Sequence, residues 1–146
     1  GRSQAIMRLA PVLLTGALLL AGCGKGANPA TDNPDSETLA VPAVAPTAAM
    51  GEQIFRRCTA CHSIDKDGSN GIGPNLHGVV GAPVAAHPGF SYSAAMKAKG
   101  GVWDKAALDI YLEAPMKVVP GTRMAFAGII DAADRQALIL YLESQK

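Results

Sequence analysis

The chain has 146 residues, 49% of them hydrophobic and 17% charged, and its formal net charge is +1. This composition excludes an acidic, disordered chain, and the near-neutral charge gives no indication of a nucleic-acid-binding protein. Three cysteines are too few for a disulfide framework. The length suits one domain with extensions.

An apolar run from Leu9 to Leu20 follows the short basic segment Met7-Arg8. A run of about a dozen apolar residues is typical of a secretory signal and is too short to span a bilayer. A Pro- and Ala-rich tract follows soon after, which argues against a buried helix of the fold. We therefore interpret residues 1–22 as a leader and signal peptide.

Cys23 closes the segment Leu20-Ala21-Gly22-Cys23, which is similar to a bacterial lipobox. In a lipobox, signal peptidase cleaves before the cysteine and the thiol receives a diacylglycerol; two or more acyl chains anchor a protein stably. The alternative is a chance cysteine in an ordinary signal peptide. Residues 24–47 are rich in Ala, Pro, Asn, Asp and Thr and have no helical or strand period. We therefore predict that residues 23–47 form a lipid-anchored flexible linker.

The segment Cys58-Thr59-Ala60-Cys61-His62 is the attachment signature of c-type haem. Two thiols at this spacing can add to the vinyl groups on one porphyrin edge, and the adjacent imidazole can then give its Nε2 to the iron. A redox dithiol and half of a zinc site share the C-x-x-C spacing. The dithiol usually accompanies a βαβ pattern, and zinc needs two further ligands at matching spacing. The motif alone therefore favours haem without excluding the other two readings.

Capping residues and apolar periodicity predict four helices joined by long loops, with no convincing pair of strands. The predicted helices cover residues 51–58, Ser93 to about Lys99, Asp104 to about Ala114, and a last segment that Asp131 caps. We expect the first and last of these helices to pack against each other.

From residue 51 onward the chain resembles the class I cytochromes c, and most closely the group of mitochondrial cytochrome c and bacterial cytochrome c2. The matching stretches occur in the family's order and at nearly its spacing. They are residues 51–55, 58–62, 73–78, 89–92, 103, 111–113 and 120–128. The resemblance implies an all-α cytochrome c fold over residues 48–146, with helices and long loops wrapped around one covalently bound haem c.

In that family the haem is attached through the two cysteines, which here are Cys58 and Cys61. The resemblance implies that His62 and Met124 are the axial ligands of the iron. It also implies that the carbonyl of Pro74 accepts a hydrogen bond from Nδ1 of the axial histidine, which leaves Nε2 for the metal.

Further residues match positions around the haem in the family. Tyr92, Trp103 and Thr122 match groups near the propionates. Tyr111 matches the tyrosine that approaches the axial sulfur, and Phe126 matches the ring that shields the exposed haem edge. Two other histidines, at positions 77 and 87, are interpreted as structural or surface residues.

Some positions depart from the family pattern. Ala82 stands where many members have an arginine that holds a propionate, and Met96 replaces a common asparagine. Fewer basic residues surround the expected haem edge, where Arg57, Lys117 and Arg123 remain, and Lys97 and Lys99 are expected farther from it. An acidic residue, at position 131, stands where a basic one is common. We therefore expect docking to partners to depend less on salt than in the mitochondrial protein.

The resemblance implies a monomeric, non-enzymatic carrier of single electrons. The signal-like leader and the lipobox-like segment add the expectation that it is exported to the bacterial periplasm and held at a membrane through acylated Cys23. Its expected partners are a membrane-bound donor such as a quinol–cytochrome c oxidoreductase and an acceptor such as a terminal oxidase. One alternative is a haem enzyme or a gas or redox sensor with a labile sixth ligand. Another is an electron-entry subunit that stays bound to a single oxidase or dehydrogenase.

Overall fold

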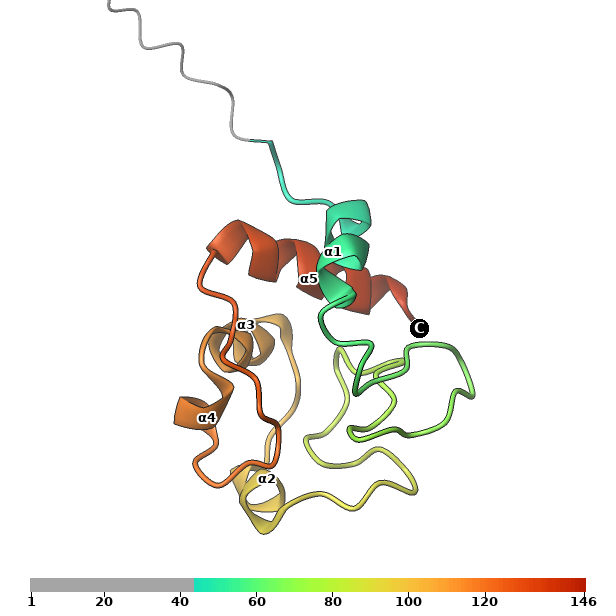
Figure 1. Cartoon of the computed structure of the whole chain (residues 1–146), viewed down its shortest axis with the longest axis vertical. Coiled ribbons are helices and arrows are strands. Elements are labelled where there is room, and N and C mark those ends of the chain that lie inside the picture. Colours follow the sequence, from blue (N-terminus) through green and yellow to red (C-terminus); the bar gives the residue numbers. More distant parts are fainter. Residues whose placement is uncertain (1–43) are drawn as a thin grey trace, which may run out of the picture. The chain divides into compact units, whose positions relative to one another are not determined.

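Helices and long loops make up the described part of the protein, residues 44–146 of a computed structural model (Figure 1). The helices are α1 (Ala48–Phe55), α2 (Ala94–Lys99), α3 (Lys105–Glu113), α4 (Pro115–Val118) and α5 (Ala132–Ser144). Over this range the β-structure is limited to one isolated bridge, between Pro83 and Val102. The predicted all-α cytochrome c fold is confirmed. The expected signal peptide, Cys23 and nearly all of the expected linker lie outside the described residues.

Side-chain caps start four of these helices, because each capping oxygen accepts a hydrogen bond from a backbone N–H three residues later. The caps predicted at Ser93, Asp104 and Asp131 are confirmed. Helix capping explains why an acidic residue stands at position 131, since its Oδ1 accepts a hydrogen bond from the amide of Asp134 at 2.9 Å. None of the helices in residues 44–146 has the length and apolar character needed to cross a bilayer.

The helices differ from the prediction in two respects. The first helix covers Ala48–Phe55 rather than residues 51–58, and the chain continues in tight turns in which the amide of Cys58 donates to the carbonyl of Phe55 at 2.7 Å. Bonds of this i→i−3 kind tighten the end of a helix. Pro115 ends α3, as expected, but also begins the short helix α4, because a proline at the first helical position needs no amide donor.

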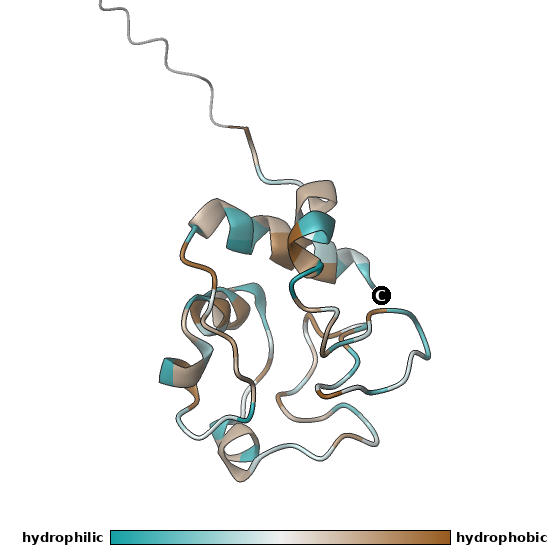
Figure 2. Cartoon of the chain, viewed as in Figure 1, coloured by the Kyte–Doolittle hydropathy of each residue, from teal (hydrophilic) through white to brown (hydrophobic). Residues whose placement is uncertain are grey.

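Helix α1 crosses α5 at a close contact that depends on Gly51. A Cβ added there would collide with the carbonyl of Ala137 and lie 2.7 Å from the Cβ of Tyr141. The ring of Phe55 lies 5.4 Å from that of Tyr141, and Leu138 is 1% exposed. Hydrophobic residues of the two helices gather at this crossing (Figure 2). The predicted packing of first on last helix is confirmed.

The hydrophobic core extends from this crossing to α3 and the loops around it. Its buried members are Phe55, Trp103, Leu108, Tyr111, Leu112, Val119, Ile129, Leu138, Ile139 and Leu142. Several partly buried apolar residues, among them Met124 and Phe126, pack against this cluster. The core therefore joins the helices directly to the loop that carries Met124.

We expect Gly51→Leu to lower the free energy of unfolding of the holoprotein by roughly 1–3 kcal/mol, because overpacking forces α1 and α5 apart. The visible spectrum should stay that of the wild type, since the helix crossing contributes no iron ligand. Thermal unfolding followed by circular dichroism measures the effect. Gln53→Leu, on the exposed side of α1, is the control. An unchanged melting temperature for Gly51→Leu would contradict this account of the crossing.

Candidate haem site

The turn that follows α1 brings the two cysteines and His62 together. The amides of Cys61 and His62 both donate to the carbonyl of Cys58, at 3.0 and 2.9 Å. Both cysteines are partly buried and form no disulfide with each other. Burial raises the pKa of the Cys58 thiol, an effect that the nearby charge of Arg57 only partly offsets.

These features weigh against the two other readings of the C-x-x-C spacing. A redox dithiol needs a thiol whose pKa is lowered, whereas the pKa of Cys58 is raised. A structural zinc site needs four clustered ligands. In the part of the chain that the structure describes, no three His, Cys, Asp or Glu side chains gather closely enough to hold a metal ion.

His62 is oriented by its contact with Pro74. Its Nδ1–H donates to the carbonyl of Pro74 at 2.7 Å, so Nε2 keeps its lone pair for a metal. Burial lowers the pKa of His62 and outweighs the opposite effect of this hydrogen bond, so the ring is held neutral, as a metal ligand must be. Gly73 makes the arrangement possible, because a Cβ there would lie 2.7 Å from Nδ1 and 2.8 Å from Nε2 of this ring.

Met124 lies on the loop between α4 and α5, where neighbouring side chains hold it. The Thr122 hydroxyl accepts a hydrogen bond from the amide of Met124 at 3.2 Å. The hydroxyl of Tyr111 donates to the Met124 sulfur at 3.5 Å. Burial raises the pKa of Tyr111, although a hydrogen bond with Thr122 opposes the shift, so the phenol keeps its proton. A neutral imidazole and an oriented thioether form a donor set that fits haem iron.

Two aromatic residues occupy positions that the family resemblance assigns to the neighbourhood of the haem propionates. Trp103 is 8% exposed, and its ring centroid lies 4.8 Å from that of Tyr111. Tyr92 is half-buried, with its ring edge against Phe90 at 4.9 Å, and burial raises the pKa of its phenol. Both aromatic residues thus present polar atoms on apolar bodies, which suits contact with the carboxylate edge of a porphyrin.

The three basic residues expected near the haem edge differ in their surroundings. The guanidinium of Arg57 lies 5.6 Å from the centroid of the Phe126 ring. Arg123 donates to the carbonyl of Ser91 and thereby joins the methionine loop, the segment between α4 and α5 that carries Met124, to the loop before α2. Lys117 is exposed on α4.

Sequence reasoning missed Arg135, a buried charge that supports the methionine loop. Its side chain is 8% exposed, and its Nε lies 2.7 Å from the Asp109 carboxylate, which raises its pKa. Its Nη1 also donates to the carbonyls of Ile129 and Ile130, at 2.9 and 2.8 Å. The segment that follows Met124 is therefore pinned to both α3 and α5. The sequence did contain an indication that Arg135 is buried, because position 135 lies on the same face of α5 as the apolar residues 138, 139 and 142.

Asn75 was also missed as an organising residue. It is 4% exposed, and its amide nitrogen lies within hydrogen-bond distance of the Ser63 hydroxyl and the carbonyls of Asp65 and Gly68. Its oxygen accepts from the amide of His77 at 2.7 Å. This one amide closes the surface loop that follows the haem motif.

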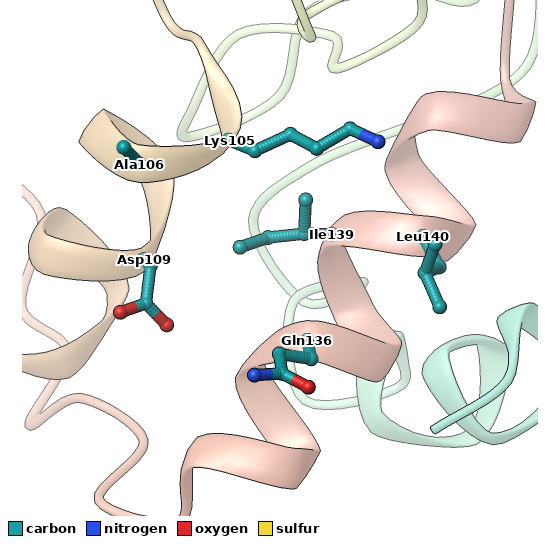
Figure 3. A pocket seen from close by; sticks show the side chains of 6 residues that line it. All are labelled: Lys105, Ala106, Asp109, Gln136, Ile139 and Leu140. Carbon is teal, nitrogen blue, oxygen red and sulfur yellow. The ribbon is translucent and has the colours of Figure 1, made fainter. Parts of the chain in front are cut away.

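Two surface hollows are lined by other parts of the domain than the two cysteines, His62 and Met124. One, of about 340 Å³, lies between α3 and α5 and is lined by Lys105, Ala106, Asp109, Gln136, Ile139 and Leu140 (Figure 3). The other, of about 440 Å³, is lined by residues that include His77 and His87. Neither hollow includes the two cysteines, His62 or Met124, so neither is the haem site.

Residues 48–146 match the model of the cytochrome c family, and the chain belongs to that family. It is 46% identical over 95 residues to cytochrome c2 of Rhodomicrobium vannielii, a match that covers 65% of this chain and 76% of the relative. It is 49% identical over 98 residues to the c-type cytochrome cy of Rhodobacter capsulatus, covering 66% of this chain but 48% of that relative. The match therefore spans about half the length of the second relative.

The solved structure of cytochrome cH from Methylobacterium extorquens is similar in both sequence and fold. It has 44% identity and a TM-score of 0.63, and the match covers 67% of this chain and 98% of that one. Membership of the family means that the protein carries one covalently bound haem c, with Cys58 and Cys61 in the haem-binding region. The domain is a monohaem, electron-carrying cytochrome.

We expect Met124→Ala to abolish the thioether–iron charge-transfer band of the ferric protein, because among residues 44–146 no other sulfur contacts the Tyr111 hydroxyl. The haem should stay covalently attached, since both cysteines remain. Absorption spectroscopy and intact mass measure the two effects. Met116→Ala is the control, because that side chain is 56% exposed. A wild-type spectrum for Met124→Ala would refute ligation by this residue.

Proposed function

We propose that the protein is a membrane-anchored carrier that moves single electrons between respiratory-chain components at the periplasmic face of a bacterial membrane. Its donor would be a quinol–cytochrome c oxidoreductase and its acceptor a terminal oxidase. The observation that carries this proposal is the pair of oriented donor side chains, His62 held by Pro74 and Met124 held by Tyr111. Together they would occupy both axial positions of the iron, which leaves no position for a substrate.

The bound haem supplies a one-electron iron couple. The protein's contribution is to keep the ligands in place while the charge changes. Pro74 prevents the imidazole of His62 from rotating, and the backbone of Met124 is restrained through Thr122. The buried Arg135 ties down the chain that follows the methionine. A ligand set with little freedom to move supports fast transfer, because little structural rearrangement accompanies each electron.

Docking would use the exposed edge around Phe126, where Arg57 stacks on the ring. Lys117 is the free cation of α4, whereas Arg123 is engaged with the backbone of Ser91. Few mobile charges at this edge therefore attract an acidic partner over a distance. A membrane tether would make long-range attraction less necessary, because it raises the effective concentration near partners in the same bilayer.

The rate of electron transfer to a purified terminal oxidase should fall less steeply with salt than the rate of mitochondrial cytochrome c with the same oxidase. The comparison runs from about 0.01 to 0.5 M ionic strength, over which the screening length shrinks several-fold. Lys117→Gln should flatten the dependence further, and Lys66→Gln, at the separate hollow, should leave it unchanged. Equal salt slopes for the two cytochromes would contradict the proposed docking mode.

The anchor is tested by membrane fractionation and intact mass of the full chain and of Cys23→Ser. The wild type should stay with the membrane fraction and show the mass of a chain that starts at residue 23 with haem and acyl groups. Cys23→Ser should lose the acyl mass and leave the membrane. Membrane retention of Cys23→Ser, or a wild-type mass without acyl groups, would eliminate the lipid anchor.

The ferric spectrum separates this proposal from a haem enzyme or sensor. A thioether–iron band in a low-spin spectrum supports the carrier, whereas a high-spin, five-coordinate spectrum requires a labile or missing sixth ligand. Co-purification in mild detergent distinguishes a shuttle from a subunit bound to one complex.

A further inference from the structure

The ammonium group at the end of α2 lies over a buried aromatic ring. Nζ of Lys99 is 4.6 Å from the centroid of the Trp103 ring. Lys99 is half-buried, whereas Lys97, two residues earlier in the same last turn, is exposed. Within residues 44–146, Lys99 forms no ion pair with a carboxylate. A cation in this position is stabilised by the face of the indole, but its charge is not neutralised by the protein.

The indole of Trp103 offers a second unused group at the same place. The residue is 8% exposed, and its Nε1–H makes no hydrogen bond to any other residue of the described range. Every fully buried side-chain nitrogen or oxygen in that range has a partner, so this N–H is not sealed inside the protein. The backbone around it is fixed, because Trp103 exchanges hydrogen bonds with Gly81 and Ala82 at 2.9 Å each. The Nε1–H of Trp103 is therefore available to donate a hydrogen bond to an acceptor from outside the described residues.

The haem supplies such an acceptor, because the carboxylates of its propionates are its anionic hydrogen-bonding groups. We propose that Lys99 is the cationic partner of the haem carboxylate to which the Trp103 indole donates a hydrogen bond, and that the charge of Lys99 raises the reduction potential of the iron. This inference rests on the proposed haem placement between His62 and Met124. Ala82, whose carbonyl accepts the Trp103 amide, has no charge to offer the same carboxylate.

The physical reason is electrostatic. Reduction lowers the charge of the haem by one unit, so a nearby cation stabilises the reduced state more than the oxidised state. The effect is larger for a half-buried cation than for an exposed one, because water and salt screen the exposed charge. Lys97 and Lys99 lie in the same last turn and share the influence of the helix end. The difference between the effects of their substitutions on the reduction potential therefore isolates the contact with Trp103.

The experiment is a redox titration of the holoprotein carrying single substitutions at these positions. Lys99→Gln should shift the midpoint potential downward, and by more than the matched control Lys97→Gln. Lys99→Arg, which keeps the charge, should retain a potential near that of the wild type. In an Ala82→Arg background, a new guanidinium beside Trp103 should take over the role, so the shift caused by Lys99→Gln should shrink.

Equal shifts for Lys99→Gln and Lys97→Gln would overturn the inference, as would a downward shift for Lys99→Arg as large as that for Lys99→Gln. An undiminished shift in the Ala82→Arg background would likewise exclude a shared carboxylate. The ferric spectrum of each variant is recorded alongside. A wild-type protein without the thioether–iron band refutes the axial ligation itself, whereas an intact band with unmoved potentials refutes only the role of Lys99.

Discussion

The hydrogen bond from Nδ1 of His62 to the carbonyl of Pro74 is the contact on which the site depends. An imidazole has two nitrogens, and the one that donates to a backbone carbonyl is no longer available to a metal. This bond therefore selects Nε2, and the absence of a side chain at Gly73 lets the loop approach closely enough to form it. Burial keeps the ring neutral, which completes the requirements for an iron ligand.

The second proposed ligand, Met124, is held by more dispersed contacts than His62. Met124 lies on a loop, and a loop by itself positions a ligand poorly. Here Thr122 restrains its backbone and Tyr111 contacts its sulfur, while Arg135 fixes the chain beyond it to α3 and α5. The crossing of α1 on α5 then connects the surroundings of the two residues, because α1 leads into the cysteines and α5 carries Arg135.

The charges of the domain divide into two groups with different consequences. Exposed cations such as Lys117 affect the approach of a partner and are weakened by salt. The half-buried Lys99, held against Trp103, acts at short range, whereas Arg57 is exposed even though it contacts the Phe126 ring. With the proposed membrane tether, attraction over a distance would matter less than the electrostatic environment of the cofactor.

The sequence by itself determined the local features, because their causes are local. Three kinds of feature depend only on residues a few positions apart. They are the attachment motif, the apolar face that includes Phe55, and the caps at Ser93, Asp104 and Asp131. The resemblance to a known family then predicted the axial ligands, which spacing alone does not do for a methionine 62 positions after His62.

Tertiary structure decided what depends on distant segments meeting in space. No local pattern indicated that Arg135 would find Asp109 across two helices, that Asn75 would close a loop through three acceptors, or that Lys99 would cover Trp103. A charged side chain near an apolar face has several energetically similar outcomes, and the choice among them is made by whichever partner the packed core brings within reach. Pro115 illustrates the same limit, because whether a helix resumes after a proline depends on the packing of the residues beyond it.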